Sequence, residues 1–124
     1  MQRVSARSEE AHRRTVESEI GDIARFLQET LGRKLVAYMA GVKDSKLVGK
    51  WARGEVRPRA EAERRLRTAF QVFQLLLSAD SAHVVRAWFV GLNPQLDDQS
   101  PANTLREGRL REVLVAAKAY LSGA

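Results

Sequence analysis

The residues of this chain that are equipped for binding chemistry are cations, and they are concentrated in one segment. Residues 33–67 contain eleven Lys or Arg and four Asp or Glu, a net charge of +7, so the rest of the chain carries −1 of the total of +6. Because Lys and Arg pair with phosphates, a basic block in an otherwise near-neutral chain predicts a polyanionic partner, most simply nucleic acid. The alternative is a charged face that only contacts solvent.

Catalytic and metal-binding chemistry finds little support in the residue types. The chain has no Cys, which excludes a disulfide, a thiolate metal site and a thiol nucleophile. His12 and His83 lie far apart and lack the spacing of metal ligands. Asp97 and Asp98 are adjacent, but no His, Cys or Glu is patterned around them, so a solvated loop or a capping role is favoured over an acid–base pair. We therefore expect a non-enzymatic protein without metal or cofactor.

The elements that position the cations are predicted to be helices. Apolar spacing, caps and breakers predict helices over residues 15–31, 33–40, 44–54, 59–79, 81–90 and 100–108, and a last helix around Val113, Leu114, Ala117 and Tyr120. No alternating strand pattern is present. Residues 1–14 are polar and are expected to be a flexible arm or a frayed helix. The predicted fold is all-α, with a first region over 15–79 and a second over 80–124.

Ala37, Gly41 and the pair Leu47/Val48 form the skeleton of a helix-turn-helix, in which Ala permits close helix approach and Gly adopts the turn. The second helix of such a unit enters the major groove. On a helical projection the apolar face holds Leu47, Val48 and Trp51, and the other face holds three cations around Gly49, which would let the backbone approach DNA. The predicted DNA-binding residues are Lys43, Ser45, Lys46, Gly49, Lys50, Arg53, Arg57 and Arg59.

A second pattern occupies the twenty-one residues from Trp88 to Gly108: an aromatic pair, Asn93-Pro94, Leu96-Asp97-Asp98, Ser100-Pro101 and Leu105. Packing of Trp88 and Phe89 on the preceding long helix is the main interpretation, and a place for one of them in a partner groove is the alternative. The pattern, continued by Val113 and Leu114, resembles the toxin-binding domain of the Xre/MbcA/ParS antitoxins over about residues 80–121. Upstream, Ala37, Gly41, Trp51 and Gly54 extend the resemblance, although the turn is one residue longer than in the common Xre pattern.

The resemblance implies a helix-turn-helix region packed on a small toxin-binding region. Such antitoxins of type II systems neutralise a RES-domain toxin, an enzyme that destroys NAD, by covering its active-site mouth, and the complex represses its own operon. The toxin-facing residues that the resemblance implies are Asn93, Leu96, Asp97, Arg106, Arg109, Arg111, Tyr120, Leu121, Ser122, Gly123 and Ala124. The alternatives are an exposed helical face for the arginines and a frayed end for the tail. A homodimer on two-fold operator DNA is expected.

Two other functions are compatible with the same residues. One is a stand-alone helix-turn-helix transcriptional regulator without a toxin partner. The other is a protein-only adaptor, in which the basic segment faces solvent and binds no DNA. No apolar run approaches the length of a membrane span, and the polar N-terminus does not resemble a secretory signal, so we expect a cytoplasmic protein.

Overall fold

The computed structural model describes residues 2–17 and 19–123, and that part of the chain is helical, with no β-strand. The helices in chain order are α1 (Gln2–Glu17), α2 (Ile20–Leu31), α3 (Arg33–Ala40), α4 (Lys46–Ala52), α5 (Ala60–Leu77), α6 (Ala82–Val90), the 3₁₀ turn η1 (Pro94–Leu96), α7 (Pro101–Arg106) and α8 (Leu110–Ser122). The predicted all-α fold is confirmed. None of the described helices has the length and apolar character needed to cross a membrane.

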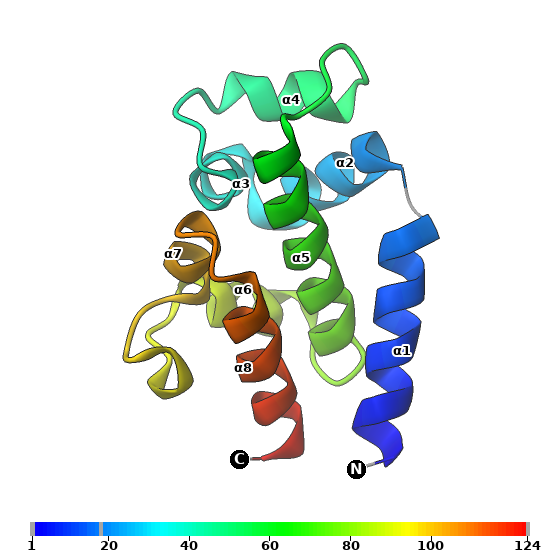
Figure 1. Ribbon diagram of the computed structural model, residues 1–124, viewed down its shortest axis with the longest axis vertical. Coiled ribbons are helices and arrows are strands. Elements are labelled where there is room, and N and C mark those ends of the chain that lie inside the picture. Colours follow the sequence, from blue (N-terminus) through cyan, green and yellow to red (C-terminus); the bar gives the residue numbers. More distant parts are fainter. Residues whose placement is uncertain (1, 18, 124) are drawn as a thin grey trace.

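Helix α5 is the centre of the molecule, and six other helices pack on it (Figure 1). Its second half is buried almost all round, through Val72, Phe73, Leu75 and Leu76, as its continuous apolar run predicts. The centre of the Phe73 ring lies 5.1 Å from the centre of the Phe26 ring of α2, in an edge-to-face arrangement. It lies 6.1 Å from the centre of the Phe89 ring of α6, which is stacked on it. The aromatic cluster therefore joins three helices that are distant in sequence.

Side-chain oxygens bind free backbone amides at three helix starts. Ser81 Oγ accepts a hydrogen bond from the Val84 amide at 3.3 Å, and Ser100 Oγ accepts one from the Asn103 amide at 3.0 Å. Gly41 ends α3 in the left-handed region, with φ 83°. Asp44 Oδ1 accepts the Lys46 N–H at 2.9 Å, so the carboxylate satisfies one of the free amides at the start of α4.

Of the two expectations for residues 1–14, a flexible arm or a frayed helix, the structure has a helix, because residues 2–17 form α1. Thr15, the expected start of the next helix, lies inside α1, and α2 begins at Ile20. α1 packs against α5 and α8 through a stripe that is at least half-buried: Val4, Arg7, Ser8 and Ala11. These positions have helical spacing, but two of the four are polar, so the stripe produces no hydrophobic period in the sequence.

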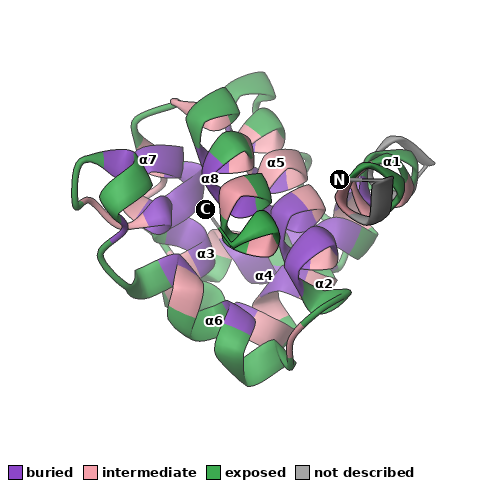
Figure 2. Cartoon of the chain, turned by 90° about the horizontal axis from the view of Figure 1, so that it is seen from below, coloured by how far each residue is buried: buried purple, intermediate pink, exposed green. Residues whose placement is uncertain are grey.

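A single cluster of buried apolar residues runs through the molecule, and it includes residues from both sides of the predicted boundary at 79/80. Figure 2 shows the buried faces of the helices turned toward one another, with α1 standing at the side. α3 also packs directly on α7, which places a helix from the first half of the predicted first region against the middle of the second.

We predict that Phe73→Ala lowers the free energy of unfolding by about 3–5 kcal/mol, because it removes a fully buried ring that contacts α2 and α6. Chemical denaturation followed by circular dichroism measures the loss. The control is Leu92→Ala, whose side chain is 78% exposed and whose substitution should change stability by less than about 0.5 kcal/mol. Equal effects of the two substitutions would contradict the placement of Phe73 at the centre of the core.

Candidate functional site

Helix α4 is held against α2 by its apolar face. Val48, Trp51 and Ala52 are buried, and α2 is its main packing partner. The helices approach closely at Gly21, where an added Cβ would lie 3.3 Å from the Trp51 carbonyl oxygen. At the end of α4, Arg25 Nη2 donates to the Ala52 carbonyl oxygen at 2.9 Å. Trp51 is thus a core residue, and its burial fixes which face of α4 meets solvent.

The exposed face of α4 is cationic. Lys46, Lys50 and Arg53 are exposed at positions i, i+4 and i+7, and Lys43 is exposed in the turn before the helix. Within residues 2–17 and 19–123, Lys43, Lys46 and Lys50 form no ion pair, so their charges are directed to solvent. Ser45 is half-buried at the start of the helix. Most of the predicted DNA-binding residues of α4 therefore do share one accessible face.

Gly49 is an exception, because the structure places it on the buried side of α4. A Cβ added there would lie 3.6 Å from Arg33 Nη1, 3.7 Å from Gln28 Oε1 and 3.1 Å from Arg53 Nη1. The expectation that Gly49 faces a duplex is therefore corrected. The helical projection assigned it to the cationic face, but it lies at the edge of that face, where α2 covers it.

The three predicted arginines after α4 differ in how free they are. Arg53 donates to Glu55, and this hydrogen bond lowers the pKa of the Glu55 carboxyl and raises the pKa of Arg53. Arg57 Nη2 lies 3.0 Å from Glu63 Oε1. Arg59 is exposed and has no ion pair in the described part of the chain. The Arg53–Glu55 pair is exposed and therefore weak, so Arg53 remains able to exchange a carboxylate for a phosphate, whereas the Glu63 carboxylate that binds Arg57 is half-buried and also binds Arg67.

A hollow of about 450 Å³ lies between α4, the following loop and the start of α5. Its apolar lining includes Leu47, Trp51 and Val56, and its rim includes Arg57 and Arg59. The hollow lies next to the cationic face, but most of its lining residues are apolar residues at the margin of the hydrophobic core.

In the C-terminal half, two of the implied toxin-facing residues are interior. Asn93 is buried, and its Oδ1 accepts the Gln95 amide at 2.9 Å, so it is the device that forms the turn into η1. Leu96 is buried as well, and η1 packs on α8. Both side chains are buried, so the structure does not present either of them as an exposed contact residue. Asn93 is buried because its side chain binds the Gln95 amide in the turn, and Leu96 is buried because it is an apolar side chain packed in the core.

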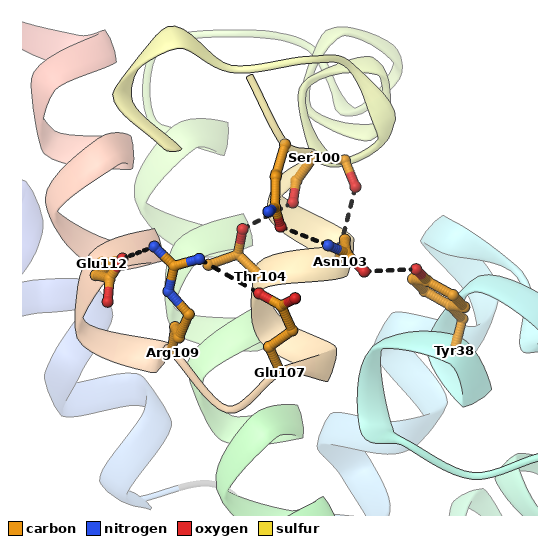
Figure 3. Close-up of polar contacts among 8 residues, drawn as sticks. Tyr38, Ser100, Asn103, Thr104, Glu107, Arg109 and Glu112 are labelled. Atoms are coloured by element: carbon orange, nitrogen blue, oxygen red, sulfur yellow. Dashed lines mark hydrogen bonds and ion pairs between the residues drawn. The ribbon is translucent and has the colours of Figure 1, made fainter. Parts of the chain in front are cut away.

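The remaining implied residues of the loop and of α7–α8 are accessible to different degrees. Asp97 is exposed with φ 55°, as is Asp98 with φ 61°. Arg109 pairs with Glu107 at 3.3 Å and also with Glu112, and the hydrogen bond from Arg109 lowers the pKa of Glu112 (Figure 3). The exposed acid pair at 97 and 98 does not converge with other ligands: the described residues hold no group of three His, Cys, Asp or Glu suited to a metal ion.

The side chains of Arg106 and Arg111 have different surroundings: Arg106 contacts α3, and Arg111 is exposed to solvent. Arg111 is exposed on α8. Arg106 instead reaches α3, where its Nη1 donates to the Tyr38 carbonyl oxygen at 2.8 Å. The implied toxin-facing set thus divides between two surfaces of the molecule.

The tail is an ordinary helix end. α8 continues through Ser122, whose Oγ donates to the Ala119 carbonyl oxygen at 3.1 Å, and Gly123 ends it with φ 76°. Leu121 packs on the core, and Tyr120 Oη donates to Asp80 Oδ2 at 3.0 Å. Residues 120–122 are therefore not an extended thread, and Ala124 lies outside the described residues.

Trp88 is half-buried and packs against the core, but its ring contacts are with Phe89 and with α8, whereas Phe89 makes the expected contact with α5. The Trp88 ring lies 5.5 Å edge-on from the Phe89 ring and 6.5 Å from the Tyr120 ring. Phe89 is fully buried and packs on α5 through Phe73. The aromatic pair thus serves mainly to hold α6 to α5 and α8.

Comparisons of this chain with protein-family models, with curated proteins and with solved structures found no match.

Alanine substitutions of two glycines, one in the turn before α4 and one on α4 itself, should change the free energy of unfolding in opposite directions. Gly41→Ala should lower the free energy of unfolding by about 1–2 kcal/mol, because its φ of 83° is unfavourable for a residue with a Cβ. Gly49→Ala should raise it by about 0.5–1 kcal/mol, since alanine is the better helix former and the nearest atom, Arg53 Nη1, belongs to a flexible side chain. Thermal and urea unfolding measure both. Destabilisation by Gly49→Ala as large as by Gly41→Ala would contradict this account.

Proposed function

We propose that this chain is a non-catalytic antitoxin of a type II system that binds operator DNA with α3 and α4 and binds a toxin with its C-terminal helices. The observation that carries the proposal is the exposed face of α4, on which Lys46 and Lys50 point to solvent without an ion pair in the described part of the chain. Autorepression follows when the DNA bound is the operon's own promoter.

The DNA-binding half of the proposal is supported by the local geometry. α3 and α4 are consecutive short helices joined by a turn that begins with a left-handed glycine, as a helix-turn-helix requires. α4 lies across one end of the molecule, and both termini are at the other (Figure 1). A duplex therefore has unobstructed access to α4, and the four cations from Lys43 to Arg53 supply phosphate affinity. Two copies on a two-fold operator would double this contact, which is why we propose a homodimer.

The toxin-binding half is supported by the Trp88-to-Gly108 pattern and its resemblance to the Xre/MbcA/ParS antitoxins. Five residues of the implied set are exposed and so available to a RES-domain toxin: Asp97, Arg111, Tyr120, Ser122 and Gly123; Arg109 is half-buried.

The burial of Asn93 and Leu96 favours a second candidate, a stand-alone transcriptional regulator without a toxin. In that case the C-terminal pattern serves only to build the core, and α4 keeps its role.

For DNA binding, we predict that Lys46→Ala combined with Lys50→Ala weakens binding to a labelled duplex of the promoter region. If each lysine neutralises one phosphate, the slope of log K against log salt should fall in magnitude by about 1.8. Fluorescence anisotropy over a salt series measures both quantities. The matched control is the pair Lys118→Ala and Arg86→Ala, two exposed cations on α8 and α6, which should leave the slope unchanged. Equal slopes for the two double variants would remove α4 as the DNA-binding helix.

For toxin binding, we predict that the chain co-purifies with the product of the adjacent reading frame and restores growth when the two are co-expressed. Arg111→Glu should weaken the complex at least about tenfold, since charge reversal at an interface adds repulsion to the lost attraction. Arg86→Glu on α6 is the matched control. Biolayer interferometry on the purified pair measures the change. A chain that neither associates with its neighbour nor relieves toxicity would favour the stand-alone regulator.

A further inference from the structure

A cationic pocket lies beside the α3–α4 turn, and it draws residues from both halves of the chain. Its volume is about 420 Å³, and it is lined by Lys34, Ala37, Tyr38, Val42, Lys43, Ser45 and Arg106. Three of these side chains are cations, two carry hydroxyl groups and none is an acid. Lys34 and Lys43 form no ion pair within the described residues. Such a lining is complementary to an anion with several oxygen acceptors.

The Arg106 guanidinium is held in place before any ligand arrives. Its Nη1 donates to the Tyr38 carbonyl oxygen at 2.8 Å, and its Cζ lies 4.8 Å from the centre of the Tyr38 ring. A guanidinium has five N–H donors, so one bond to a carbonyl leaves donors for a ligand. Arg106 has no carboxylate partner in the described part of the chain, which distinguishes it from Arg109.

Tyr38 is fixed in turn by α7. Its Oη donates to Asn103 Oδ1 at 2.8 Å, and the Asn103 amide group donates to Gln99 (Figure 3). The Asn103 backbone N–H is bound by Ser100 Oγ at 3.0 Å. α7 therefore carries Arg106 on a chain of hydrogen bonds that locks it to α3, the helix that precedes the cationic face.

From this arrangement we infer that the pocket binds a backbone phosphate of the duplex that α4 engages, and that α7 contributes Arg106 to the DNA-binding surface. The inference rests on the proposed DNA binding and deepens it. Lys43 lies in both the pocket and the turn that leads into α4, so a duplex seated on α4 brings a phosphate to this position. Arg106 then acts on DNA rather than on a partner protein, and Lys34 joins the same site. Phosphate contacts of this kind add affinity and fix register without reading bases.

The test uses a double-mutant cycle on the full chain. Binding to a labelled random-sequence duplex is measured by anisotropy over a salt series for Arg106→Gln, Lys34→Gln and the double variant. Each single variant should reduce the magnitude of the salt slope by about 0.9, the value for one phosphate. If both cations hold the same phosphate, the double variant should lose little more than either single one, because residues that share a ligand are not additive.

Two controls keep the outcome interpretable. Arg86→Gln removes an exposed cation from α6 and should leave the slope unchanged. Because Arg106 also contacts α3, circular dichroism must show Arg106→Gln folded; Lys34 has no such contact, so Lys34→Gln carries the test if Arg106→Gln unfolds.

A failure of the phosphate site and a failure of DNA binding by α4 give different results. Wild-type slopes for both single variants, with a reduced slope for the Lys46/Lys50 double variant, would overturn the phosphate site and leave DNA binding by α4 intact. A wild-type chain with no salt-dependent duplex binding would overturn both. Inorganic phosphate added at constant ionic strength should compete with the duplex more for wild type than for Lys34→Gln, because it occupies the same donors. Wild-type slopes for both single variants, combined with Lys34-dependent binding of inorganic phosphate, would assign the pocket to a free anion instead.

Discussion

The molecule depends on the burial of α5, and the exposed face of α4 is one consequence of that burial. The second half of α5 is apolar on nearly every side, so a single partner helix leaves much of it in water, and six helices pack around it instead. The Phe26 and Phe73 rings meet edge to face, which helps to fix α2 on α5. α2 then provides the surface on which Val48 and Trp51 of α4 are buried. The lysines of α4 face solvent because the opposite, apolar face of the helix is buried against α2.

The same core joins the two ends of the sequence, and this affects how the proposed functions relate. α3 is packed on α7, and the Tyr38 side chain is bonded to Asn103 across that junction. A partner protein that docks on α7 or α8 therefore touches a rigid body that also carries the α3–α4 pair. The physical expectation is that protein binding changes DNA affinity by occlusion or by added charge, and not by a hinge between the halves, since one buried cluster covers the boundary at 79/80.

The sequence predicted the elements whose signals are local. The range of α3 and the capping roles of Ser100 and Asp44 were readable because a side chain and the amide it bonds lie within three residues. For residues 1–14 the sequence left a flexible arm and a frayed helix open, because the inward stripe of α1 includes the polar residues Arg7 and Ser8 and gives no hydrophobic period. Gly49 was assigned to the exposed face of α4 because a helical projection of α4 alone does not show which of its residues a neighbouring helix covers. The approach of Arg106 to Tyr38 joins residues sixty-eight positions apart, so only the fold reveals it.

Charge counting also overstates how much of the basic segment is available to a polyanion. Four acids lie among the eleven cations of residues 33–67, and three of them accept ion pairs from nearby arginines: Glu55 from Arg53, Glu63 from Arg57 and Arg67, and Glu61 from Arg65 at 4.0 Å. The fourth, Asp44, has its Oδ1 bonded to the Lys46 amide and withdraws no lysine charge by an ion pair within the described residues. The pairing is therefore concentrated after α4. Seven cations of the segment form no ion pair within the described residues: Arg33, Lys34, Lys43, Lys46, Lys50, Arg59 and Arg64. Three of them, Lys43, Lys46 and Lys50, lie in the α3–α4 turn and along α4, so the proposed DNA-binding helix keeps its lysine charges although the segment as a whole loses part of its charge to ion pairs.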